Sequence, residues 1–213
     1  RLSYFLTGGP PDEELSRLAD AGEIRRKENL LQQTDRLLEG SGSRRFVEDF
    51  AAQWLDLDQI NFTEPDSKLY SGFDAIVENS MLDETQSYLD TMLRNNMSVQ
   101  HLIDSDFTFL NSRLARYYGI PNVTGDELRR CELTPESHRG GVLTHGSILK
   151  VTANGSNTSP VVRGVWISER LLGVPIPAPP GNVPAIEPDI RGATTIREQL
   201  AKHREQASCA SCH

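Results

Sequence analysis

The sequence is poor in cysteine, in positive charge and in long apolar segments. Three cysteines in 213 residues are too few for the disulfide framework of a small secreted scaffold. The chain has 30 Asp and Glu against 22 Lys and Arg, a net charge of −8. This acidity argues against a nucleic-acid binder, which needs basic patches to displace counterions from phosphates. No run of about 18 apolar residues occurs, so we expect no transmembrane segment in this chain.

The signatures of several enzyme classes are missing too. The sequence contains no glycine-rich phosphate loop, no nucleophile elbow and no H-E-x-x-H zinc motif. Two D-x-D pairs, Asp56/Asp58 and Asp104/Asp106, are candidates for calcium binding or acid–base catalysis, although isolated pairs of this kind mostly cap helices. Whether the chain is an enzyme is therefore left open by its sequence.

One motif of the chain indicates a specific cofactor. It is Cys209-Ala210-Ser211-Cys212-His213, the C-x-x-C-H signature of haem attachment. Two thiols on one helical turn can each bond a vinyl group of haem c, and the next imidazole becomes the proximal iron ligand. With 3 Cys and 5 His in the chain, chance matches are expected on the order of 0.001. We assign Cys209 and Cys212 to haem binding and His213 to the iron.

Other uses of two neighbouring cysteines are a half zinc site, a redox dithiol or a plain disulfide. A thioredoxin-like dithiol needs a βαβ setting, which the sequence does not predict. A zinc site needs a second pair of ligands. The residues on offer for that pair are Cys131, His138, His145 and His203.

Three histidines are further candidates for haem contact. His203 lies ten residues before His213 in a predicted helix, where it either lines the haem edge, for example at a propionate, or faces solvent. His138 and His145 flank a Gly-Gly pair, and each is either a distal ligand or a structural residue. We assign His203 to the haem-binding set and leave the distal ligand open.

Sulfur-containing side chains elsewhere are expected to be structural. Cys131 falls in a short predicted strand, residues 129–133, and is interpreted as a buried, inert thiol rather than a reactive one. Met81 and Met92 have the spacing of core residues in a long predicted helix, and with Met97 they are taken as packing or loop residues rather than iron ligands.

Apolar spacing predicts a mainly α fold, an irregular helical bundle in two consecutive domains with few short strands. A proline- and glycine-rich extended strap is predicted over residues 174–188. The aromatic residues Phe46, Phe50 and Trp54 recur at helical spacing and are expected in the core with Val47, Ala51 and Leu57. The predicted helices cover residues 12–21, 24–38, 43–57, 74–95, 107–118, 143–149, 160–172 and 196–204.

Several longer strings occur in a fixed order: R-L-S-Y-F-L, P-D-E-E-L, F-A-A-Q-W-L-D-L, D-F-T-F-L-N-S-R-L-A-R-Y-Y-G-I, R-G-G-V-L-T, S-P-V-V-R-G-V-W, P-I-P-A-P-P and the haem motif. In these the chain resembles the large cytochrome-bearing proteins of planctomycetes, built from tandem domains of unknown function 1592 and 1588. The resemblance implies two domains, residues 1–124 and 125–213, and export to the periplasm or cell surface. The chain departs from the family's sequence after R-L-S-Y-F-L, where it has Thr7-Gly8-Gly9-Pro10.

The resemblance and the motif together predict a segment of an exported multidomain c-type cytochrome that transfers electrons through covalently bound haem. Its expected partners are other domains of the same polypeptide and a redox protein. Because the proximal His is the last residue and haem needs a pocket on both faces, we expect the chain to be a piece of a longer protein. We expect covalent haem c in the intact protein and an incomplete or absent haem site in this piece. The alternatives are an oxidoreductase, for example of carbohydrates, with the haem as electron relay, and a structural or adhesion domain with a vestigial motif.

Overall fold

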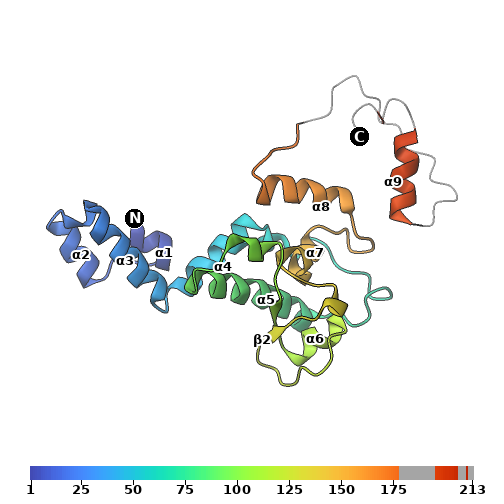
Figure 1. The fold of residues 1–213 in the computed structure, drawn as a ribbon, viewed down its shortest axis with the longest axis horizontal. Coiled ribbons are helices and arrows are strands. Elements are labelled where there is room, and N and C mark those ends of the chain that lie inside the picture. The colour runs from blue at the N-terminus through green and yellow to red at the C-terminus, as the bar shows by residue number, and fades with distance from the viewer. Residues whose placement is uncertain (178–194, 206–209, 211–213) are drawn as a thin grey trace. The chain divides into compact units, whose positions relative to one another are not determined.

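The computed structural model describes residues 1–177, 195–205 and 210, and most of them lie in helices (Figure 1). The chain divides into two units, Arg1–Val174 and Pro175–His213. Within the described residues the only sheet has two strands. The prediction of a mainly α fold with few short strands is therefore confirmed, whereas most of the predicted strap falls outside the described residues.

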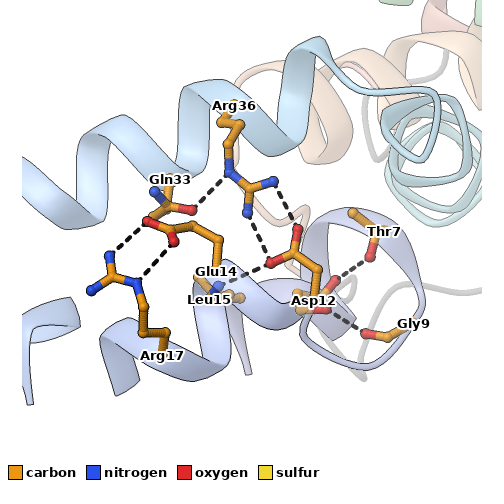
Figure 2. A network of polar contacts seen from close by, with 9 residues as sticks. Thr7, Gly9, Asp12, Glu14, Leu15, Arg17, Gln33 and Arg36 are labelled. Carbon is orange, nitrogen blue, oxygen red and sulfur yellow. Dashed lines mark hydrogen bonds and ion pairs between the residues drawn. The ribbon is translucent and has the colours of Figure 1, made fainter. Parts of the chain in front are cut away.

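The N-terminal part of the first unit is a group of short helices held by polar contacts (Figure 2). Asp12 caps the second helix by accepting a 2.9 Å hydrogen bond from the Leu15 amide. Arg36 on the third helix reaches the same carboxylate at 2.7 Å and Gln33 at 2.8 Å. One carboxylate thus fixes both the start of a helix and the helix beside it. These helices are α1 (Leu2–Thr7), α2 (Glu13–Asp20) and α3 (Lys27–Glu39).

The centre of this unit is α5 (Ala75–Arg94), which packs along α4 (Ser43–Trp54) (Figure 1). Asp74 accepts a 2.9 Å hydrogen bond from the Val77 amide and so caps the predicted helix at its expected start. Ile76, predicted to be on the buried face, is 60% exposed. It lies about 100° around the helix from the buried Val77, which takes the core position instead.

The prediction that the aromatic residues of α4 lie in the core is wrong for Phe46 and Phe50, whereas Trp54 packs against the core from a partly buried position. Phe50 is 45% exposed, and Phe46 and Trp54 are only partly buried. Their rings contact one another, with centroids 5.6 Å apart for Phe46–Phe50 and 5.3 Å for Phe50–Trp54. Val47 and Ala51 occupy the core side of the helix, so the larger rings form a neighbouring stripe that is partly open to solvent.

The start of one predicted helix is instead a strand of a two-stranded antiparallel sheet. Residues 107–110 were expected to be helical with the rest of 107–118, but they pair with residues 129–132 in the register Thr108↔Cys131. Their aromatic and β-branched side chains suit a strand, and Asn111 caps the helix that follows through the Leu114 amide at 2.8 Å. The elements are β1 (Phe107–Leu110), α6 (Ser112–Tyr118) and β2 (Arg129–Glu132).

The rest of the first unit adds short helices to the same core. A cluster of buried apolar side chains joins Ala51, Leu55 and Leu57 to Ile148 and Trp166. The cluster therefore connects residues about 100 positions apart in the chain. The elements that follow β2 are α7 (Gly146–Val151), α8 (Pro160–Trp166) and a π-helical turn, η6 (Ile167–Leu171). The 3₁₀ turns are η1 (Glu23–Arg25), η2 (Leu57–Gln59), η3 (Val99–Leu102), η4 (Pro135–Ser137) and η5 (Val142–Thr144).

The second unit contains α9 (Ile196–Glu205), in agreement with the predicted helix over residues 196–204. Among the residues that the structure describes, no helix combines the length and the apolarity that crossing a bilayer requires. The predicted division into domains 1–124 and 125–213 stays a prediction.

Candidate functional site

The haem-attachment residues predicted from the sequence, Cys209, Cys212 and His213, lie outside the described residues, as does the side chain of His203. Their assignment to haem c stays a prediction. In the part of the chain that is described, no group of three or more His, Cys, Asp or Glu is placed to hold a metal ion.

The two D-x-D pairs have ordinary structural surroundings. Asp56 has a φ of 58° at the start of η2 and forms a 2.8 Å ion pair with Arg170. Asp104 and Asp106 are exposed in the loop before β1. Neither pair belongs to a cluster of metal-ligating residues among the described residues.

The sulfur-containing side chains lie where packing was predicted. Cys131 is half-buried on β2, and burial raises the pKa of its thiol, which favours the unreactive protonated form. Met81 and Met92 are core residues on α5, and Met97 packs against the same interior.

His138 and His145 have different surroundings. His138 is exposed and adopts a φ of 52° at the end of η4. His145 is 2% exposed, with its Nδ1 atom 2.9 Å from Thr85 Oγ1 and its ring edge-on to Tyr88 at 5.0 Å. Its Nε2 atom is buried and has no hydrogen-bond partner among the described residues. His145 is thus an interior residue of the first unit.

The pKa of His145 lies below its ordinary value because burial disfavours the imidazolium. The nearby Glu84 carboxylate opposes this shift, and Arg139 adds to it. At neutral pH the ring is accordingly uncharged, as a structural histidine in a core requires.

A buried carboxylate, Glu84, is the centre of a polar cluster that the sequence analysis missed. Glu84 is 1% exposed on α5. One of its oxygens accepts a 2.6 Å hydrogen bond from Thr108 Oγ1, and the other accepts a 2.5 Å hydrogen bond from the Tyr118 hydroxyl. The only available signal was an acid located between Met81 and Tyr88 on the apolar side of α5.

Tyr118 connects this cluster to a third helix. Its hydroxyl oxygen accepts a 2.8 Å hydrogen bond from the Gly146 amide at the start of α7. Burial and the neighbouring charge of Glu84 hold the pKa of Tyr118 well above its usual value. The hydroxyl therefore stays protonated. It donates a hydrogen bond to Glu84 and accepts one from the Gly146 amide.

A cavity of about 380 Å³ lies beside Tyr118. Gly146 at its wall cannot carry a side chain, because a Cβ there would collide with the Tyr118 hydroxyl and would lie 2.7 Å from Met81 Cγ. Apolar and aromatic residues form the larger part of the wall, and three cations, two threonines and two glycines complete it. The apolar and aromatic side chains are Pro65, Tyr70, Phe73, Met81, Tyr117, Tyr118, Leu149 and Ala153. The cations are Arg139, Lys150 and Arg163.

Lys150 connects segments of the cavity wall through an ion pair and hydrogen bonds. It is 8% exposed, and its Nζ atom lies 3.0 Å from a Glu78 carboxylate oxygen and 2.9 Å from the Thr63 carbonyl oxygen. It also donates to the Ile60 carbonyl. Because an ammonium has three N–H donors, these contacts satisfy it completely, and it fastens the loop after η2 to α7.

Residues 1–120 match the family model PSD4, described as a protein of unknown function (DUF1592). The chain belongs to this family. Residues 139–213 match a second model, PSCyt3, described as a protein of unknown function (DUF1588). The tandem order confirms the resemblance noted from the sequence, and the names indicate cytochrome c-type domains of planctomycetes. Significant matches were found neither among curated proteins nor among solved structures.

Both matched regions contribute to the cavity. Tyr70, Phe73 and Tyr118 come from the region that matches DUF1592, whereas Arg139 and Arg163 come from the region that matches DUF1588. The aromatic side chains of the wall and its cations thus come from different family regions of one folded unit.

Proposed function

We propose that this chain is a segment of an exported multidomain c-type cytochrome, located in the periplasm or at the cell surface, that transfers electrons through haem c. The observation that carries the proposal is the C-x-x-C-H motif at the end of the region that matches PSCyt3. Covalent attachment to such a motif takes place after export, which is why we propose an extracytoplasmic location. Neighbouring domains of the same polypeptide and a redox protein are the proposed partners.

In this proposal the chain's own residues hold the cofactor. Cys209 and Cys212 supply the two thioether bonds, His213 supplies an axial nitrogen, and His203 from the preceding helix contributes to the edge of the haem site. The bound haem supplies a one-electron Fe²⁺/Fe³⁺ couple. Its potential depends on the axial ligand and on burial, so residues around the motif tune it.

The proposal is tested by producing the whole protein in a periplasm that has haem-attachment machinery. Haem should remain on the polypeptide after denaturation, and the double variant Cys209→Ala/Cys212→Ala should lose it. His213→Ala should change the iron spectrum. Cys131→Ala is the matched control, because it removes the remaining cysteine, which lies outside the motif, and should keep the covalent haem.

Two results would contradict the proposal. Covalent haem in the Cys209→Ala/Cys212→Ala protein would show that attachment uses other residues. A folded wild-type protein that acquires no haem under these conditions would favour the structural alternative.

An oxidoreductase that uses the haem as an electron relay is the second candidate function. The cavity lined by Tyr118 and Arg139 favours it, because a simple electron carrier has no need for a small-molecule site. Six-coordinate, low-spin iron without turnover would favour the carrier, whereas an open iron position with turnover would favour the enzyme.

A further inference from the structure

We propose that the cavity beside Tyr118 is a binding site for a small aromatic carboxylate. In this proposal Arg139 and Arg163 pair with the carboxylate, and the aromatic side chains of the wall hold the ring. The site lies within the first unit and does not depend on the proposed haem.

The cavity has the size and lining of a small-molecule site. Its volume of about 380 Å³ falls in the range of about 300–1,000 Å³ that is typical of ligand pockets. Such pockets combine mainly apolar walls with a few polar groups that orient the ligand, and this cavity has the same division between aromatic side chains and cations.

Neither arginine forms an ion pair with a carboxylate among the described residues. Arg163 donates to two neutral hydroxyls, Thr152 Oγ1 at 3.3 Å and Thr158 Oγ1 at 2.7 Å. Arg139 donates to the Thr144 carbonyl at 2.5 Å and lies 3.4 Å over the Tyr118 ring. A guanidinium has five N–H donors, so both side chains have donors left for a ligand.

Arg139 and Arg163 differ from the other described arginines because they are half-buried and lack an ion pair, whereas the others without one are exposed. Eight other arginines form ion pairs with Asp or Glu: Arg17, Arg26, Arg36, Arg44, Arg94, Arg113, Arg130 and Arg170. Among the described residues, no carboxylate pairs with Arg139 or Arg163, although the protein is acidic overall. Both are half-buried, and a partly desolvated guanidinium is stabilised by a carboxylate that accepts two parallel hydrogen bonds.

The aromatic part of the wall suits a flat ring. Phe73 and Tyr117 meet edge to face, with centroids 6.2 Å apart and an interplanar angle of 64°. Aromatic rings prefer such offset or perpendicular neighbours, so an aromatic ligand can extend this arrangement. A phosphate dianion would lose more hydration in these apolar walls than a carboxylate, which is why we commit to a singly charged head group on an apolar body.

Isothermal titration of the 213-residue chain with benzoate tests the proposal, and benzamide is the neutral ligand of the same shape. We expect 1:1 binding of benzoate with a Kd of about 1 mM or tighter, as a ligand of this size permits. Benzamide should bind at least about 10-fold more weakly, because it cannot form the charge-assisted pair. Inorganic phosphate should not displace benzoate at equal concentration.

Two variants locate the site. Arg163→Gln should weaken benzoate binding about 10-fold or more, whereas Arg116→Gln, which removes a charge from an exposed position on α6 outside the cavity wall, should leave it within about 2-fold. Ala153→Phe should abolish binding by filling the cavity while keeping both arginines. Thermal unfolding of each variant confirms that it is folded.

Several results would overturn the proposal. These are no binding of benzoate at millimolar concentration, equal binding of benzamide, displacement of benzoate by phosphate, an equal loss in Arg116→Gln and Arg163→Gln, and unchanged affinity in a folded Ala153→Phe protein. The Cys209→Ala/Cys212→Ala protein should bind benzoate like the wild type, so failure of the haem proposal and failure of this one are distinguishable.

Discussion

The hydroxyl of Tyr118 donates a 2.5 Å hydrogen bond to the carboxylate of Glu84, which is 1% exposed. This contact connects α6 to α5, and the Gly146 amide on the same hydroxyl adds α7. A buried carboxylate is tolerated only when its oxygens have partners, so the position of three helices depends on one phenol group.

Tyr118→Phe should therefore destabilise the protein. It leaves one oxygen of Glu84 and the amide of Gly146 without their partner, at a cost of about 1–3 kcal/mol in the free energy of unfolding. Urea denaturation measures this cost. Tyr4→Phe is the control, because Tyr4 is 62% exposed and its hydroxyl should contribute nothing measurable. A Tyr118→Phe protein as stable as the control would contradict the role given to this hydrogen bond.

The buried His145 predicts a loss of stability in mild acid. Burial lowers the pKa of His145 in the folded state below its ordinary value of 6.5. Between the lowered pKa and pH 6.5 the unfolded chain binds a proton that the folded chain does not, so the free energy of unfolding falls as the pH decreases through this range. Chemical denaturation between pH 7.5 and about 5 measures the slope.

Variants at the two histidines identify the source of that slope. His145→Gln removes the titrating group and should flatten the dependence, whatever its effect on stability at pH 7.5. His138→Gln removes an exposed histidine and should keep the slope of the wild type. If the His145→Gln protein lost stability in acid as steeply as the wild type, other groups would be responsible.

Truncating the buried Trp166 should destabilise the protein more than truncating Phe50 of the partly exposed aromatic stripe on α4. Trp166 is 6% exposed, and its indole N–H lies 3.4 Å from the Leu55 carbonyl. Trp166→Ala should cost about 3–5 kcal/mol, as large aromatic truncations in a core do. Phe50→Ala should cost about 1 kcal/mol because the ring is 45% exposed. Equal losses in thermal or urea unfolding would mean that the aromatic stripe is more buried than described.

Gly141 should be intolerant of any side chain. Its φ of 67° and ψ of 176° belong to a region that is essentially limited to glycine, and a Cβ would lie 2.6 Å from the Leu102 carbonyl oxygen. Gly22 also has a positive φ of 70° but open space around it. We expect Gly22→Ala to cost about 1 kcal/mol and Gly141→Ala at least about twice as much. Similar melting temperatures for the two variants would contradict the close backbone approach.

Local signals in the sequence were sufficient for most helices. Asp74 caps α5 where its position before an apolar stripe predicted, and α9 follows the predicted span closely. The C-x-x-C-H motif needs no structure to be recognised, because its chemistry depends on spacing within one turn.

Features that depend on distant partners could not be predicted in this way. β1 is a strand because β2 pairs with it from about 20 residues later, and nothing within residues 107–110 specifies that partner. Phe50 has the spacing of a core residue, yet Val47 and Ala51 take the core side. The role of Glu84 likewise depends on Thr108 and Tyr118 from other elements.

The two family regions share one apolar core, and this has a consequence for how they can evolve. Ile148 and Trp166 come from the region that matches DUF1588, and they fill the interior formed by Ala51 and Leu55 from the region that matches DUF1592. A gene that encoded only one of the two regions would produce a polypeptide with an open apolar face, prone to aggregation. We therefore expect recombination to move the two regions between proteins as one block, with new modules joined outside the pair.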